Sequence, residues 1–296
     1  KDSQHMTPEM LDLVDTVIYD IQDIGARFYT YISTLLYVMR DCAAAGKELV
    51  VLDRINPLGG KIEGGMLQPG FESFVGVYPL TTRYGLTPGE FARLANEEQH
   101  IGCTLHVLPV QGWRRKMLFP ETGLTWMMPS PAIPHFETAL LYPGVCLAEA
   151  TNLSEGRGTS APFELIGAPF INGAALTTRM NALKLPGVAF TAAYFTPSAS
   201  KHANQRCEGV HIHLTDTKAF DTIRTGTALL YAIREMYSAA FALRQPENEH
   251  ALLPINRLTG SDVLAGEWPD FDALMTRWER ESAAFKARAA KAYLYE

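Results

Sequence analysis

The sequence has few cysteines, no excess of positive charge and no long hydrophobic run. Its 296 residues include four cysteines that lie far apart, so neither a disulfide framework nor a structural zinc site is expected. No apolar stretch approaches the ~20 residues that a membrane-spanning helix needs. The net charge of −6 and the lack of a basic stripe argue against nucleic acid as a partner.

Motifs of several common enzyme classes are also missing. The sequence contains no Gly-x-Ser-x-Gly elbow, no GxxxxGK followed by Ser or Thr, and no His-Glu-x-x-His. The stretch GGKIEGG has glycines but lacks the spacing and the strand-to-helix context of a dinucleotide site. Hydrolase triads, nucleotide binding and zinc-protease chemistry are therefore disfavoured, and no cofactor is expected.

The first half of the chain has the strand, helix, strand order of a parallel α/β sheet. Short apolar runs predict buried strands at TVIYD (16–20) and ELVVLD (48–53), and the helical periodicity between them ends at Gly46. Such a βαβ unit implies a parallel sheet with a right-handed crossover. The stretch LTPGEFARLANEEQ then predicts a helix with a capping box, and TLHVLPV (104–110) predicts the next strand.

A long connection rich in proline and aromatic residues, 111–134, follows this half of the chain. Loops of this length are usually functional or lie between domains, so we predict two domains, residues 1–112 and 113–296. In the second domain, strands are predicted at VCLAEA (145–150), GVAFTAAYFTP and GVHIHLTD. Helices are predicted near 136–141, over 173–183, at FDTIRTGTALLYAIREMY and at the C-terminal end.

Polar side chains follow two neighbouring strands of the predicted parallel sheet. The candidates are Asp20, Asp23, Arg27, Tyr31, Asp53 and Arg54. Because the carboxyl ends of parallel strands form the face where ligands bind, a shared polar site is predicted there. The alternative is that Asp20 or Asp23 caps the following helix and that Tyr31 packs in the core.

The densest polar stretch begins in VCLAEA and runs to residue 164. It contains Glu149, Asn152, Glu155, Arg157 and Glu164, and two glycines bracket the arginine. Asn152 suits a sugar acetamide or hydroxyl, and Arg157 suits a carboxylate of the protein or of a ligand. The alternative is a structural network in which Arg157 pairs with Glu149 or Glu164 and holds the loop in place.

Two histidines, His211 and His213, would lie on one face of the strand predicted at GVHIHLTD. They could begin a zinc site, but no third ligand is fixed by spacing, so no metal is expected. A metal-dependent hydrolase that uses Asp20, Asp23 and these histidines remains the less favoured alternative.

The sequence resembles the exo-β-N-acetylmuramidases of the NamZ type, bacterial enzymes that release N-acetylmuramic acid from non-reducing ends of peptidoglycan fragments. The resemblance rests on stretches between about residues 7 and 216. They include YDIQDIGARFYTYIS, VVLDRINPLGG, FVGVYPLTTRYGLTPGE and TALLYPGVCLAEATNLSEGRGTSAPFELIGAP. It implies a Rossmann-like parallel-sheet domain, truncated at its N-terminus, a second α/β domain and an active cleft between them.

The resemblance also implies a peptidoglycan-derived sugar substrate that carries a lactyl carboxylate and an acetamido group. Glycoside hydrolysis usually uses two carboxyl groups. The catalytic candidates are Glu155, Glu149, Asp20 and Asp23. The substrate-binding candidates are Asn152, Arg157, Glu164, Asp53, Arg54, Arg27 and Tyr31.

Family members carry a further N-terminal segment with a Pro-Glu-His-Gly motif, whose glutamate is an expected catalytic acid. This sequence opens just ahead of TPEML, so we expect the chain shown to be truncated. Because peptidoglycan lies outside the cytoplasmic membrane, an exported protein, periplasmic or extracellular, is expected. The alternative function is a non-catalytic protein that binds muropeptides or sugars.

Overall fold

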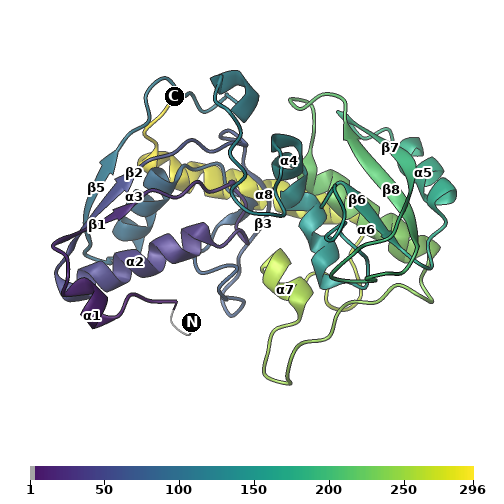
Figure 1. Ribbon diagram of the computed structural model, residues 1–296, viewed down its shortest axis with the longest axis horizontal. Helices are drawn as coiled ribbons and strands as arrows, with labels where there is room; N and C mark the ends of the chain where they lie inside the picture. Colours follow the sequence, from purple (N-terminus) through teal and green to yellow (C-terminus); the bar gives the residue numbers. More distant parts are fainter. Residues whose placement is uncertain (1–3) are drawn as a thin grey trace. The chain divides into compact units, whose positions relative to one another are not determined.

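The structure of the protein, a computed structural model, describes residues 4–296 and has a mixed α/β fold with a small parallel sheet and an antiparallel sheet (Figure 1). Unit 1 runs to Thr125 and includes Trp278–Glu296, and unit 2 is Trp126–Arg277. The predicted domain ranges, 1–112 and 113–296, stay a prediction. The first three residues, on which the expected truncation partly rests, lie outside the described residues.

Unit 1 contains a three-stranded parallel sheet in the order β1-β2-β5. The strands are β1 (Thr16–Tyr19), β2 (Glu48–Leu52) and β5 (Thr104–Leu108). In register, Ile18 pairs with Val50, and Val50 pairs in turn with His106. The predicted strands and their parallel pairing are confirmed.

Two helices of unit 1, α2 (Tyr31–Ala45) and α3 (Pro88–Glu98), pack against this sheet (Figure 1). The unit also contains α1 (Pro8–Leu11), the end of α8 (Phe271–Ala289), and the short helices η1 (Phe119–Thr122) and η3 (Ala290–Ala292). Gly46 ends α2 in the left-handed conformation, as predicted. The predicted capping box of α3 is also confirmed, because Thr87 and Glu90 bond reciprocally at 3.2 and 3.0 Å.

An antiparallel pair, β3 (Glu63–Met66) and β4 (Thr81–Arg83), was not predicted from the sequence. Its first strand is rich in glycine, which weakens any strand signal. Gly65 is required by packing within unit 1, because a Cβ there would lie 2.4 Å from the indole nitrogen of Trp278. The strand is therefore specified by a close approach and not by its own propensity.

Unit 2 is built on an antiparallel sheet in the order β6-β8-β7. The strands are β6 (Leu165–Ala168), β7 (Val188–Phe195) and β8 (Cys207–Leu214), and the helices are α4 (Phe136–Val145), α5 (Gly173–Ala182), α6 (Thr222–Met236), α7 (Pro254–Thr259) and the start of α8. Helix α5 covers β7 and β8, whereas α4 packs against α6. The predictions of β7, β8, α5, α6 and α8 are confirmed.

The predicted strand at residues 145–150 is wrong. Helix α4 continues past Pro143 and passes directly into a short helix, η2 (Cys146–Ala150). Gly144 lets α4 approach α6 closely, since a Cβ there would lie 1.8 Å from the carbonyl oxygen of Thr222. An apolar run of six residues suits a buried helix as well as a buried strand, and here the tertiary contact decides.

The helices of residues 4–296 include none that is both long and apolar enough to cross a membrane.

Candidate active site

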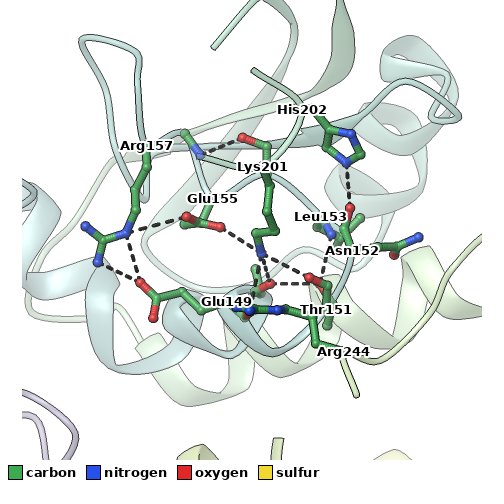
Figure 2. A network of polar contacts seen from close by, with 12 residues as sticks. Glu149, Thr151, Asn152, Leu153, Glu155, Arg157, Lys201, His202 and Arg244 are labelled. Carbon is green, nitrogen blue, oxygen red and sulfur yellow. Dashed lines mark hydrogen bonds and ion pairs between the residues drawn. The ribbon is translucent and has the colours of Figure 1, made fainter. Parts of the chain in front are cut away.

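A polar network in unit 2 joins η2, the glycine-flanked turn that follows it, and the loop between β7 and β8 (Figure 2). Its charged members are Glu149, Glu155, Arg157, Lys201 and Arg244. Three of these were predicted as site residues from the sequence. Two basic residues, Lys201 and Arg244, were not.

Arg157 lies between two carboxylates. Its Nε and Nη2 donate to Glu149 Oε1 at 3.0 and 2.7 Å, and its Nε lies 3.5 Å from Glu155 Oε1. Partial burial lowers the pKa of Arg157, but the Glu149 and Glu155 carboxylates oppose this change, and the pKa is raised overall. The pairing of Arg157 with Glu149, one of the two pairings considered from the sequence, is therefore present.

Exposure differs between the two carboxylates. The Glu149 side chain is 29% exposed and that of Arg157 is 39% exposed, whereas the Glu155 side chain is 3% exposed. A ligand that approaches the network from solvent therefore meets Glu149 and Arg157 first. Glu155 lies on the buried side of Arg157, and its main-chain oxygen accepts the Phe163 N–H at 2.6 Å.

Lys201 holds Glu155 in this network. Its Nζ lies 2.9 Å from Glu155 Oε2 and donates to the carbonyl oxygens of Ala148 and Thr151 at 2.8 and 3.0 Å (Figure 2). Burial lowers the pKa of Lys201, and the Glu155 carboxylate opposes this change. The ammonium thus joins the end of η2 to the carboxylate that lies behind Arg157.

The turn around Arg157 depends on the two glycines that bracket this residue. Gly156 and Gly158 have φ angles of 76° and 81°, which side chains rarely adopt. A Cβ on Gly158 would lie 2.5 Å from the amide nitrogen of Ala199, and the Gly158 carbonyl accepts the Ser198 N–H at 2.8 Å. This contact brings the β7–β8 loop, and with it Lys201, to Glu155.

Asn152 makes its side-chain contacts within the protein. Its Nδ2 donates to the carbonyl of Ala240 at 2.8 Å, and its Oδ1 accepts the N–H of Ala242 at 3.0 Å. The main-chain oxygen of Asn152 lies 2.7 Å from Nε2 of His202. The side chain fastens one loop to another here, and its predicted contact with a sugar stays a prediction.

Glu164 has other partners than Arg157. Its Oε1 accepts from Thr138 at 2.5 Å and lies 3.3 Å from Nε2 of His135, while its Oε2 lies 3.7 Å from Nε2 of His211. His211 and His213 do share one strand face, with ring centroids 4.2 Å apart. In the part of the chain that the structure describes, no three His, Cys, Asp or Glu residues are placed to hold a metal ion.

In unit 1, two of the residues predicted to form a site at the carboxyl ends of the parallel strands form an ion pair. Arg54 Nε donates to Asp20 Oδ1 at 2.7 Å, and both side chains are nearly half exposed. Tyr31 opens α2, its carbonyl accepts the Tyr19 hydroxyl at 2.9 Å, and its ring packs edge-on against Tyr29. This tyrosine lies half-buried at the helix start.

The other two acidic residues predicted at these strand ends, Asp23 and Asp53, are buried. Asp23 accepts from the Gly25 N–H at 2.7 Å and from the Tyr84 hydroxyl, and burial raises the pKa of Asp23 to about 7. Asp53 accepts from Thr87, the Gly89 N–H and Tyr295, and burial raises its pKa as well. Asp53 thereby fixes the start of α3.

Arg27 is also buried, with 1% of its surface exposed. Its Nη1 donates to the carbonyls of Gly65 and Leu80 at 2.9 Å each, and burial lowers the pKa of Arg27 to about 10. These bonds attach the chain after β1 to β3 and to the segment before β4. The substrate-binding role of Arg27 stays a prediction.

The sequence-predicted residues thus form two sets, one in each unit. In unit 2, Glu149, Glu155 and Arg157 come together, and Glu164 joins a separate histidine cluster. The expectation that this set faces the acidic residues of unit 1 stays a prediction. The two carboxylates can give or take a proton. The arginine between them can bind a ligand that carries a carboxylate.

Comparison with known families gives two matches that together cover nearly the whole chain. Residues 1–137 match the N-terminal part of the family described as exo-beta-N-acetylmuramidase NamZ, and residues 140–295 match its C-terminal part. The chain is 48% identical over 236 residues to peptidoglycan beta-N-acetylmuramidase NamZ of Bacillus subtilis strain 168. The match covers 79% of this chain but 57% of that protein, so the chain spans a little over half the length of this curated relative.

Two crystal structures of DUF1343 family proteins from Bacteroides fragilis are similar in fold. The first has a TM-score of 0.92 and 32% sequence identity, and the match covers 100% of this chain and 79% of that chain. The second has a TM-score of 0.75 and 26% identity, with coverage of 98% and 78%.

Proposed function

The chain belongs to the NamZ family of exo-β-N-acetylmuramidases, and we propose that it is an exo-acting glycoside hydrolase. The proposed reaction releases N-acetylmuramic acid from the non-reducing ends of peptidoglycan fragments. It is supported by the family description, exo-beta-N-acetylmuramidase, and by the name of the Bacillus subtilis relative, a peptidoglycan beta-N-acetylmuramidase. The observation that carries the proposal is the pair of carboxylates, Glu149 and Glu155, held around Arg157.

The geometry supports a division of roles within this pair. Glu149 and Arg157 are open to solvent, so they are placed to contact the sugar, with Arg157 opposite its lactyl carboxylate. Glycosidic cleavage needs a carboxyl group that gives or takes a proton, and Glu149 is the accessible candidate. Glu155, clamped by Lys201, positions Arg157 from the buried side.

The finer description of the fold belongs to the same proposal. We infer that unit 1 is a Rossmann-like domain, which is supported by three parallel strands with α2 and α3 beside them. We further infer an exported protein, periplasmic or extracellular, because its proposed substrate lies outside the cytoplasmic membrane.

The test is turnover of a chromogenic N-acetylmuramic acid glycoside by variants of the full-length protein. Glu149→Gln keeps the shape of the side chain but removes its proton chemistry, and kcat should fall roughly a hundredfold or more. Glu155→Gln should also lower kcat, and Arg157→Gln should mainly raise KM. Glu137→Gln, on an exposed position of α4, is the matched control and should leave both constants unchanged.

Near-normal rates in both Glu149→Gln and Glu155→Gln would remove this carboxylate pair from the mechanism. If the unaltered protein bound the glycoside without cleaving it, the proposed activity itself would be wrong. Circular dichroism of each variant separates lost chemistry from lost folding.

A further inference from the structure

Unit 2 contains a cavity away from the network around Arg157, lined by both charged and apolar residues. It has a volume of about 720 Å³ and lies between the end of α5, one face of α6 and the start of α8. The side chains that matter here are Arg179, Arg224, Tyr231, Arg234, Glu235 and Asp272. None of the lining residues, all within the described part of unit 2, belongs to the Arg157 network. This volume suits a sugar or another small molecule.

Aromatic rings orient two of the three arginines in this cavity. The guanidinium of Arg234 lies 4.6 Å from the centre of the Trp268 ring, and that of Arg224 lies 5.7 Å from the Phe271 ring. Stacking of this kind holds the planar fork of an arginine in place while its N–H groups stay available for an anion.

The three arginines differ in their acidic partners. Arg179 lies 3.0 Å from Glu235, and Arg224 lies 3.8 Å from Asp272. Arg234 has no carboxylate within ion-pair distance among residues 4–296. A ligand carboxylate would therefore complete the contacts of Arg234 without first displacing an acid.

The remaining lining decides what is attached to that carboxylate. Tyr231 lines the cavity, and its hydroxyl group already donates to the carbonyl of Pro269 at 2.9 Å. Glu235 and Asp272 are well exposed and would accept hydrogen bonds from hydroxyl groups. These acids also disfavour a doubly charged phosphate, because like charges repel. A sugar with a single carboxylate matches this lining.

We propose that this cavity is a second binding site for a carboxylate-bearing amino sugar of the N-acetylmuramic acid type, with Arg234 as the carboxylate anchor. The site goes beyond the proposed hydrolysis, and only the choice of sugar rests on it. It holds a sugar away from Glu149 and Glu155, so binding there does not lead to cleavage.

The test titrates the protein with N-acetylmuramic acid and follows the fluorescence of Trp268, which lies beneath Arg234. N-acetylglucosamine lacks the lactyl ether group, and with it the carboxylate, and is the matched ligand control. Loss of a charge-assisted hydrogen bond should weaken binding roughly tenfold or more. The same weakening is expected for N-acetylmuramic acid with Arg234→Gln. A Trp268→Phe variant keeps a ring beneath the guanidinium, and loss of the fluorescence change in this variant shows that the change comes from Trp268.

Two further variants complete the design. Arg206→Gln changes an exposed arginine of unit 2 that also stacks on a ring, that of Tyr194, and should bind as the unaltered protein does. Arg157→Gln should impair turnover while leaving the Trp268 signal intact, so failure of the proposed hydrolysis is distinguishable from failure of this site. The inference is overturned by unchanged affinity in Arg234→Gln, by equal binding of the two sugars, or by the absence of a saturable signal at millimolar sugar.

Discussion

Replacing Asp23 by asparagine should remove a strong pH dependence from the stability of unit 1. The Asp23 side chain is buried and accepts two hydrogen bonds on Oδ2, from the Gly25 N–H and the Tyr84 hydroxyl. Among the described residues no group donates to Oδ1. Burial outweighs the two bonds and raises the pKa of this carboxyl from 3.8 to about 7.

The sign follows from proton binding. Between pH 3.8 and about 7 the folded protein holds the Asp23 proton more tightly than the unfolded chain does. Its contribution to stability is therefore complete below pH 4 and is lost as the pH rises through 7. The loss is about 1.4 kcal/mol per pH unit across this window, or about 2 to 3 kcal/mol between pH 5 and pH 8.

Urea unfolding followed by circular dichroism at pH 5, 6, 7 and 8 measures this loss. Asparagine resembles the protonated acid, so Asp23→Asn should gain stability over the unaltered protein by about 2 to 3 kcal/mol across the series. Asp20→Asn, at an exposed aspartate that pairs with Arg54, is the matched control and should show no such gain. Parallel pH curves for the Asp23→Asn variant and the unaltered protein would refute the argument.

Two further substitutions test packing and capping. Lys201→Met leaves the buried Glu155 carboxylate without its cation and should cost about 3 to 5 kcal/mol, read as a lower urea midpoint, with a smaller loss for Lys201→Arg. Thr87→Ala removes half of the α3 capping box and should cost about 1 kcal/mol, whereas Thr87→Ser should cost less. An unchanged urea midpoint in Lys201→Met or in Thr87→Ala would contradict the role assigned to the side chain that the variant removes.

Much of unit 1 could be predicted because its signals are local. Short apolar runs bounded by polar residues gave β1, β2 and β5, and helical periodicity with Gly46 as the stop gave α2. The capping box of α3 is readable from four consecutive residues, and it forms as expected. Wherever a few neighbouring residues determine an element, the sequence was sufficient.

The predictions failed where distant contacts decide. Residues 145–150 form a helix because α4 packs closely on α6 at Gly144, a contact between segments about eighty residues apart. The glycine-rich β3 is specified by its contact with Trp278, more than two hundred residues later. No window of neighbouring residues contains either constraint.

The candidate site divides in the same way. Glu149, Glu155 and Arg157 lie within nine residues, so their clustering could be anticipated from the sequence. Lys201 could not, because it lies in a loop of small polar residues without a motif. It reaches Glu155 only because Gly158 and Ser198 join two loops.

The arrangement around Arg157 also reconciles its structural and its proposed binding role. A guanidinium has five N–H groups, and Glu149 takes up only one from Nε and one from Nη2, both through a single oxygen. Among the described residues no acceptor engages Nη1, and the side chain is more than one-third exposed. The two partners considered for Arg157 from the sequence, a protein carboxylate and a ligand carboxylate, are therefore compatible. Glu149 can bind one edge of the guanidinium while a sugar carboxylate binds the other. The loss of this second edge is the reason that Arg157→Gln is expected to raise KM.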